Sequence, residues 1–229
     1  QKKMALLKRN TWKRWMSWFN EIPVDFRESD ISGKVEVVWV NGRKVLNSER
    51  ANYSFGTLYR VFQKTFNMIH LKDEAFHKIL ILGYGAGGTA QILREDYDFK
   101  GIIHGVEYDR GIVEIAKTHF PDGHAAADEI FITDAQRFVQ QCQPAFYDLV
   151  IFDVYVDLYI PDQFQQPVFI SALDSILKKG GMLIYNKVMS GNPDKKHARE
   201  LYETMNSRFS SVEKLTRGLQ ENLMFVCRK

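Results

Sequence analysis

A regular alternation of strand-like and helix-like segments, which begins near residue 78, constrains the fold of this chain more than any other feature. The strand-like segments are Lys78–Leu82, Gly101–Glu107, Glu129–Thr133, Tyr147–Phe152 and Met182–Asn186. The helix-like segments between them are Thr89–Arg94, Gly111–His119, Ala135–Gln141 and Gln163–Lys178. Strands that alternate with helices join through right-handed crossovers into a parallel sheet with helices on both faces. The sequence therefore predicts the α/β class, with a doubly wound, mostly parallel, Rossmann-like sheet.

The last part of the chain extends this pattern. A helix-like segment, Lys195–Phe209, is followed by two strand-like segments, Ser211–Thr216 and Asn222–Arg228, which a short loop containing Gly218 joins. Two strands joined so closely pair antiparallel. We therefore expect an antiparallel C-terminal strand pair beside the parallel strands.

The first fifty residues predict a smaller element. Lys34–Leu46 contains two β-rich runs around Asn41-Gly42, a pair typical of a type I′ hairpin turn. We therefore expect residues 1–50 to form a basic N-terminal helix and a small β-hairpin element, and residues 51–229 to form the Rossmann-like catalytic domain.

Basic residues are concentrated at the start of the chain. The first fourteen residues contain six Lys or Arg and no acid, whereas the rest carries 25 basic and 28 acidic side chains. This distribution argues against a nucleic-acid-binding body. Trp12, Trp15, Met16 and Phe19 have helical spacing, so the segment is interpreted as an amphipathic helix. Docking on its own domain, docking on a dimer partner and lying on a membrane surface all remain open.

The rest of the composition is that of a soluble protein. No apolar run approaches the roughly 20 residues that a membrane-spanning helix needs, and the N-terminal apolar residues are interrupted by Lys8, Arg9, Lys13 and Arg14, unlike a signal peptide. We therefore expect a cytoplasmic protein without a membrane span. The six histidines and two cysteines show no metal-ligand spacing, so no metal site is predicted.

A glycine-rich loop follows the first strand of the alternation. Gly83-Tyr84-Gly85-Ala86-Gly87-Gly88 lies between that strand and a helix, where glycines let the backbone approach a ligand and the helix presents free N–H groups. Glu107 ends the next strand, where a carboxylate can accept hydrogen bonds from ribose hydroxyls. This pattern serves nicotinamide dinucleotides and S-adenosylmethionine alike.

The length of the chain after the fifth strand separates these two ligands. Only 41 residues follow Val188, too few for the second βαβ half that a dehydrogenase normally needs. S-adenosylmethionine is therefore the predicted cofactor. Asp134, at the end of the third strand, is placed to accept a hydrogen bond from an adenine amino group, or alternatively to cap the helix that follows.

Several of these segments together resemble a known family. Ile79–Gly88, Gly105–Asp109, Thr133-Asp134 and Tyr147–Asp153 are similar to the spermidine/spermine synthase branch of the class I S-adenosylmethionine-dependent methyltransferase fold, and Trp18–Glu21 is similar to the Trp-Phe-x-Glu that opens those synthases. The resemblance implies that Gly83, Gly85 and Gly87 line the methionine and ribose portion of the cofactor, and it makes a homodimer one expected arrangement. The predicted cofactor-binding residues are Gly83, Tyr84, Gly85, Ala86, Gly87, Glu107, Tyr108, Asp134, Ala135 and Asp153.

The chain departs from that family where an acceptor would bind. Ala86 stands where aminopropyl-transferring synthases have an acid, and Asp153-Val-Tyr155-Val-Asp157 replaces their Asp-Ser-x-Asp. Because several carboxylates hold a polyamine in these synthases, the departures predict methyl transfer to an unidentified small acceptor. Aminopropyl transfer from decarboxylated S-adenosylmethionine in polyamine biosynthesis is the alternative, and a non-catalytic nucleoside-binding protein is a third. Asp153, Tyr155 and Asp157 are the predicted catalytic residues.

Overall fold

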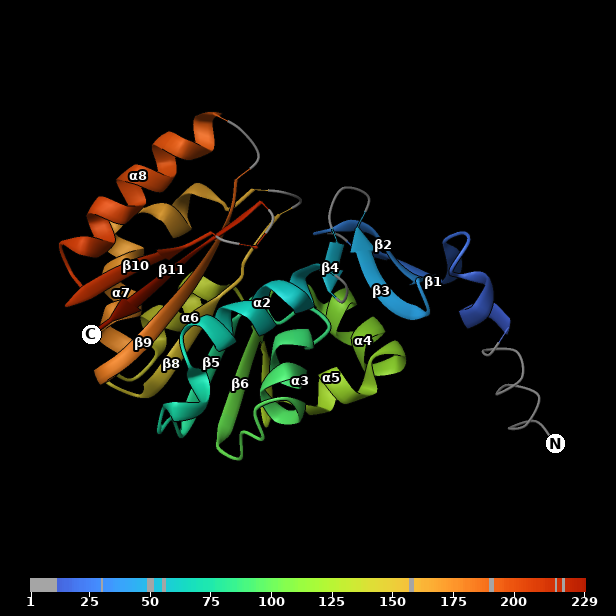
Figure 1. Ribbon diagram of the computed structural model, residues 1–229, viewed down its shortest axis with the longest axis horizontal. Coiled ribbons are helices and arrows are strands. Elements are labelled where there is room, and N and C mark those ends of the chain that lie inside the picture. Colours follow the sequence, from blue (N-terminus) through green and yellow to red (C-terminus); the bar gives the residue numbers. More distant parts are fainter. Residues whose placement is uncertain are drawn as a thin grey trace.

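The computed structural model describes residues 12–29, 31–48, 52–54, 57–156, 159–189, 192–216, 218–219 and 221–229. Within these residues the chain forms a small N-terminal sheet and a larger sheet flanked by helices (Figure 1). No helix among the described residues is long and apolar enough to cross a bilayer.

The larger sheet has seven strands in the order β10-β11-β9-β8-β5-β6-β7 within the described chain. Their bounds are β5 (Lys78–Leu82), β6 (Ile102–Glu107), β7 (Glu129–Ile132), β8 (Tyr147–Phe152), β9 (Leu177–Val188), β10 (Ser211–Leu215) and β11 (Asn222–Arg228). The pairs among β5 to β9 are parallel, whereas β11 pairs antiparallel with both β9 and β10. The structure thus has the predicted mostly parallel sheet with an antiparallel C-terminal pair.

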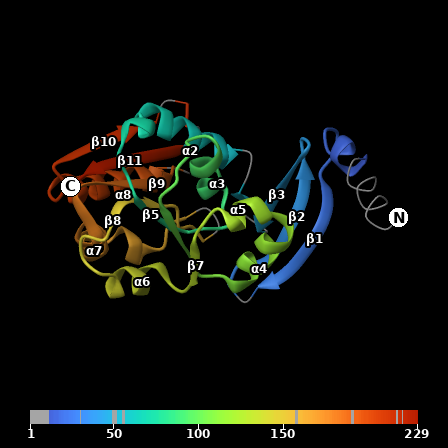
Figure 2. The ribbon, with the colours of Figure 1, turned by 90° about the horizontal axis from the view of Figure 1, so that it is seen from below.

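Helices cover both faces of this sheet (Figure 2). The helices are α2 (Thr57–Met68), α3 (Gly88–Glu95), α4 (Arg110–His119), α5 (Pro121–Ala125), α6 (Ala135–Gln141), α7 (Pro167–Ile176) and α8 (Asn192–Asn206), with 3-10 turns η1 (Leu71–Asp73) and η2 (Asp162–Gln165). Leu80 and Leu82 of β5 pack in a core with α6, α7 and α8, whereas Ile79 and Ile81 pack in a second core with α2 and α3. A strand buried on both faces needs apolar residues at every position, which explains the continuous apolar run in β5.

The N-terminal sheet contains four antiparallel strands: β1 (Ile22–Ser29), β2 (Gly33–Val40), β3 (Arg43–Ser48) and β4 (Asn52–Ser54). The β2–β3 hairpin turns at Asn41 and Gly42, which have φ values of 49° and 75°, as a type I′ turn requires. The sequence did not predict β1 and β4. β1 was missed although Ile22, Val24 and Phe26 are apolar at alternate positions, because Pro23 is unfavourable inside a strand and the apolar run is short.

The N-terminal sheet packs against α4. Val35, Val37 and Leu46 form a small core with Ile112 and Ile115 of this helix. At the surface, Arg27 pairs with Glu114 at 2.8 Å and Asp25 with His119 Nε2 at 2.7 Å. These contacts join β1 and β2 to the part of the larger sheet that follows β6.

The helix before β9 differs most clearly in type from the sequence expectation, and α8 lies three residues earlier in the chain than the expected Lys195–Phe209. The predicted helix over residues 163–178 begins only at Pro167, after η2, because proline fits the first turn of a helix and not its interior. It ends at Ile176, and Leu177 and Lys178 already belong to β9, which starts before the predicted Met182. The short helix α5 was also not predicted.

Candidate active site

A cavity of about 510 Å³ lies at the carboxyl ends of the parallel strands. From β5 the chain proceeds outward through β6 and β7, and then crosses to the opposite side of β5 to form β8 and β9. This reversal of strand order lies between β5 and β8, which is where open α/β sheets bind ligands. The position of the cavity follows from the topology of the sheet.

The glycine loop and the end of β8 meet in close backbone contact. Gly83 has φ 84°, and a Cβ atom at this position would lie 2.2 Å from the carbonyl oxygen of Asp153. The amide nitrogens of Gly83 and Tyr84 donate to Val106 O at 3.0 and 2.9 Å, and Asp153 N donates to Leu82 O at 2.8 Å. Only glycine fits at residue 83, so this residue sets how closely the two loops approach beside the cavity.

Glu107 forms hydrogen bonds with the backbone of the glycine loop and of the segment after β6. One carboxylate oxygen accepts from Gly85 N at 2.9 Å and the other from Asp109 N at 3.0 Å. Burial raises the pKa of Glu107, against the opposing effect of these two hydrogen bonds. A carboxylate has about four acceptor sites, more than these backbone N–H groups occupy, so Glu107, which lines the cavity, can also accept from a hydroxyl of a bound ribose.

Asp134 caps the helix that follows it and also lines the cavity, whereas its contact with adenine stays a prediction. Its Oδ1 accepts from Arg137 N at 2.9 Å and caps α6, and the residue also lines the cavity. The next residue, Ala135, and the exposed ring of Tyr108 line the cavity as well. The carboxyl ends of β6 and β7 therefore present one acid each to the same space.

Asp153 follows β8 and faces the cavity. Asn186, on the neighbouring strand β9, donates from Nδ2 to Asp153 Oδ1 at 2.8 Å. Burial raises the pKa of Asp153 to about 7, and the hydrogen bond from Asn186 partly opposes this shift. Tyr155 donates its hydroxyl to Asn186 O at 2.7 Å, so the same asparagine orients both predicted catalytic residues. Asp157, the third predicted catalytic residue, lies outside the described residues.

Three predicted cofactor-binding residues do not line the cavity, and here the expectation needs correction. Tyr84 turns into the protein, where its hydroxyl donates to Gly123 O at 2.6 Å and its ring covers Gly105. Ala86 is fully buried in the core beneath the N-terminal sheet. Gly87 caps α3 with φ 82° and packs against the backbone of Gly123. Of the predicted loop residues, Gly83 and Gly85 line the cavity.

Part of the cavity wall comes from segments that the sequence did not identify. Ile31 and Ser32 of the β1–β2 turn and Leu58 of α2 close one side, while Glu221 and Asn222 close the side formed by β11. No sequence motif around these residues indicates that they belong to the site. Asn222 is brought beside β9 by its antiparallel pairing with Val188, which only the folded sheet shows.

Two buried amide oxygens lie in this wall. The Oδ1 atoms of Asn186 and Asn222 have no hydrogen-bond donor among the described residues. Both asparagines line the cavity on adjacent strands. A buried carbonyl oxygen without a donor is unfavourable, so a ligand N–H group that reached either oxygen would gain a strong contact.

The ionisable residues of the wall are all acidic. Among the described lining residues there is no Lys, Arg or His. The acids are Glu107, Asp109, Asp134, Asp153 and Glu221. Asp109 is already engaged, since it accepts from Ser29 Oγ at 2.5 Å and from Gly111 N at 2.8 Å. A concave site lined by one sign of charge attracts ligands of the opposite sign, so this cavity suits a cationic ligand.

Comparison with known proteins identifies the family to which this chain belongs. Residues 64–220 match the family described as the spermine/spermidine synthase domain. The chain belongs to the spermine/spermidine synthase family. A probable polyamine aminopropyl transferase of Bifidobacterium longum is 31% identical over 146 residues, which cover 64% of this chain and 32% of the relative. A polyamine aminopropyltransferase of Streptococcus uberis is 28% identical over 153 residues, covering 65% and 52%. The match thus spans between a third and a half of these relatives.

The fold also resembles that of family members with solved structures. A probable spermidine synthase from Corynebacterium glutamicum superposes with a TM-score of 0.71 at 18% identity, over 90% of this chain and 80% of that one. This likeness confirms the predicted fold.

Proposed function

We propose that this protein transfers an aminopropyl group from decarboxylated S-adenosylmethionine to an amine of the polyamine class. The observation that carries the proposal is the charge of the cavity, whose described lining includes five acids and no basic residue. Both proposed substrates are cations at neutral pH. The names of the curated relatives support the same activity.

The charge of the cavity also favours the decarboxylated donor over S-adenosylmethionine itself. S-adenosylmethionine carries an α-carboxylate, for which the described lining offers no cationic side chain. The decarboxylated compound lacks that group and keeps the sulfonium and the ammonium. We assign its adenosine to the side formed by Glu107 and Asp134, and its sulfonium to the space between Gly85 and Asp153.

The reaction needs positioning and the removal of one proton. The neutral amine nitrogen attacks the propyl carbon bonded to sulfur, a C–N bond forms, and the C–S bond breaks. The bonding pair stays on sulfur, which yields neutral methylthioadenosine, and the product amine releases a proton. Asp153 is the proposed acceptor of that proton, because a base whose pKa is about 7 is matched to proton transfer at neutral pH.

Methyl transfer, the activity that the departures in sequence predicted, has less support from the cavity. That prediction counted carboxylates along the motifs of the family. Ala86, where an acid was found missing, is buried away from the cavity, and Glu221 adds an acid that the motifs do not include. The described lining therefore contains more acids than the family motifs alone suggested, which supports an amine substrate.

The test is a product analysis with both donors. The protein is incubated with putrescine or spermidine and with either decarboxylated or intact S-adenosylmethionine, and the nucleoside products are measured by mass spectrometry. We expect methylthioadenosine from the decarboxylated donor. S-adenosylhomocysteine with a methylated amine would establish methyl transfer instead. Calorimetric binding of methylthioadenosine without turnover of any amine would favour the non-catalytic alternative.

A further inference from the structure

An aromatic surface at the N-terminal end has no role in the proposed reaction. Trp12, Trp15, Trp18 and Phe19 are 52%, 65%, 64% and 70% exposed. The rings of Trp15 and Phe19 pack edge to face with centroids 5.5 Å apart, so these two side chains form a continuous apolar surface. Contiguous exposed apolar surface of this kind marks an interaction site in a soluble protein. We call these four residues with Lys13 and Arg14 the N-terminal patch.

Ser17 fixes the patch to the N-terminal sheet. This buried residue accepts a hydrogen bond from Gly42 N on Oγ at 2.9 Å, and its carbonyl oxygen accepts from Asn41 N at 2.8 Å. Ser17 Oγ also donates to Arg14 O at 2.7 Å. The helical turn over residues 12–16 is thereby held on the β2–β3 turn, and its aromatic side chains remain exposed.

The patch lies at one end of the molecule. Figures 1 and 2 show the N-terminal helical turn that carries these residues, in dark blue, at the opposite end from α8 and from the strand pair β10 and β11. The cavity is lined by Ile31 and Ser32, which lie at the other end of β2 from Asn41 and Gly42. A large surface can therefore contact the patch and leave the proposed active site open.

The stretch of sequence that contains the patch is strongly basic. Lys13 and Arg14 lie within it, and the first fourteen residues as a whole carry six Lys or Arg and no acid. The remaining residues have a small excess of acids. An amphipathic segment with tryptophans and basic residues is suited to the interface of a bilayer that contains anionic lipids.

We propose that the N-terminal patch is a binding site for an anionic lipid surface. A second copy of the chain is a less suitable occupant, because a two-fold contact would place this positive segment against itself. Nucleic acid shares the negative charge, but single strands bind along an extended basic groove, whereas the described patch is confined to residues 12–19. The proposal does not depend on the proposed activity.

The experiment is co-sedimentation of the full chain with lipid vesicles. One set contains phosphatidylcholine alone and the other contains phosphatidylcholine mixed with phosphatidylglycerol. We expect binding to the mixed vesicles, a blue shift of tryptophan fluorescence on binding, and release as the NaCl concentration rises. Equal binding to both sets, or binding to neither, would overturn the proposal.

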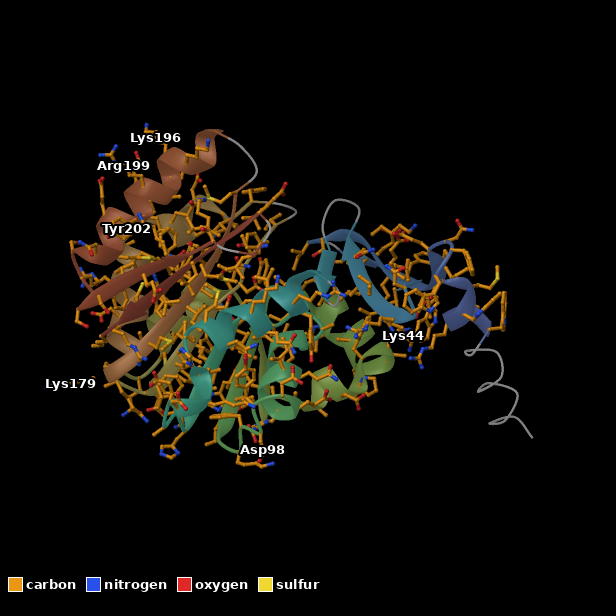
Figure 3. All side chains as sticks on the ribbon, in the orientation of Figure 1. Lys44, Asp98, Lys179, Lys196, Arg199 and Tyr202 are labelled. Atoms are coloured by element: carbon orange, nitrogen blue, oxygen red, sulfur yellow. The ribbon has the colours of Figure 1, made fainter. Side chains whose placement is uncertain are left out.

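Paired variants test whether the patch is responsible. Lys13→Glu with Arg14→Glu should weaken binding to anionic vesicles about tenfold or more, because each basic residue near the surface contributes to the attraction. The control is Lys196→Glu with Arg199→Glu, which makes the same change of charge on exposed residues of α8 at the other end of the molecule (Figure 3). Equal loss in both variants would show attraction to the whole protein rather than to this site.

The contribution of the aromatic side chains to vesicle binding is tested with a second variant and its control. Trp15→Ala with Phe19→Ala should lower vesicle affinity at unchanged charge, whereas Val168→Ser, an exposed apolar residue of α7, should not. Near-ultraviolet circular dichroism and thermal unfolding verify that each variant is folded. Patch-dependent dimers in sedimentation velocity, or tighter binding to a single-stranded oligonucleotide than to anionic vesicles, would replace lipid with one of the other occupants.

Discussion

Asn186 Nδ2 donates a hydrogen bond to Asp153 Oδ1 at 2.8 Å, and this contact joins the ends of β8 and β9 at the wall of the cavity. It gives the carboxyl group a fixed orientation and a donor that favours its ionised form. Because burial raises the pKa of Asp153 to about 7, the group changes its protonation state near neutral pH. The activity of the protein should therefore depend on this pair.

Replacing the carboxyl group tests its role as proton acceptor. Asp153→Asn keeps the size of the side chain and removes the base, so we expect kcat to fall by about 100-fold or more. The affinity for methylthioadenosine should change little, which calorimetry measures. Asp122→Asn, at the exposed start of α5, is the matched control. Wild-type kcat in Asp153→Asn would assign the proton to another acceptor.

The pH profile tests the influence of the asparagine. A base must be ionised, so kcat/KM should rise with pH through a midpoint of about 7. The hydrogen bond from Asn186 lowers the pKa of Asp153, so Asn186→Leu should raise that pKa and move the midpoint upward by about one pH unit. A midpoint that stays in place, with activity otherwise retained, would contradict this account.

Glu107 is expected to control the affinity for the donor. Glu107→Ala removes the acceptor for ribose hydroxyls and for two backbone N–H groups, so affinity for methylthioadenosine should fall roughly 10- to 100-fold and the melting temperature should also fall. Glu114→Ala, which removes only an exposed ion pair with Arg27, should change neither quantity appreciably. Unchanged donor affinity in Glu107→Ala would place the ribose elsewhere.

Glu221 is expected to act on the acceptor amine rather than on the donor. Glu221→Gln removes one negative charge from the side of the cavity formed by β11, so the KM for the amine should rise by about threefold to tenfold while the affinity for methylthioadenosine is unchanged. The control, Glu213→Gln, changes an exposed acid of β10. A change in donor affinity alone would reverse the proposed placement of the two substrates.

The sequence predicted those parts of the fold whose local residue pattern is typical of a single backbone conformation. β5 to β8 are short apolar segments bounded by loops, and Asn41-Gly42 has the backbone preference of a hairpin turn. β1 was not identified, since its short apolar alternation is interrupted by Pro23 and the strand is held by pairing with β2 and by side-chain contacts with α4. Long-range contacts of this kind leave no local signal.

The sequence predicted the site residues at the ends of strands but not the orientation of the loop residues. Residues at the ends of parallel strands meet because of the sheet, and so Glu107, Asp134 and Asp153 were found. Spacing does not show which way a loop residue points, and so Tyr84 and Ala86 were assigned to the ligand although they pack into the protein. Whether Asp157 takes part stays a prediction.

The turn between β1 and β2 supplies Ile31 and Ser32 to the cavity, and Ser29 at the end of β1 bonds to Asp109 beneath it. The N-terminal sheet therefore forms part of the cavity wall and cannot be removed without changing the cavity. Trimming it to obtain a minimal catalytic fragment would open the pocket to bulk water. A chimera made with a relative would retain its substrate preference only if this turn and α4 were exchanged together.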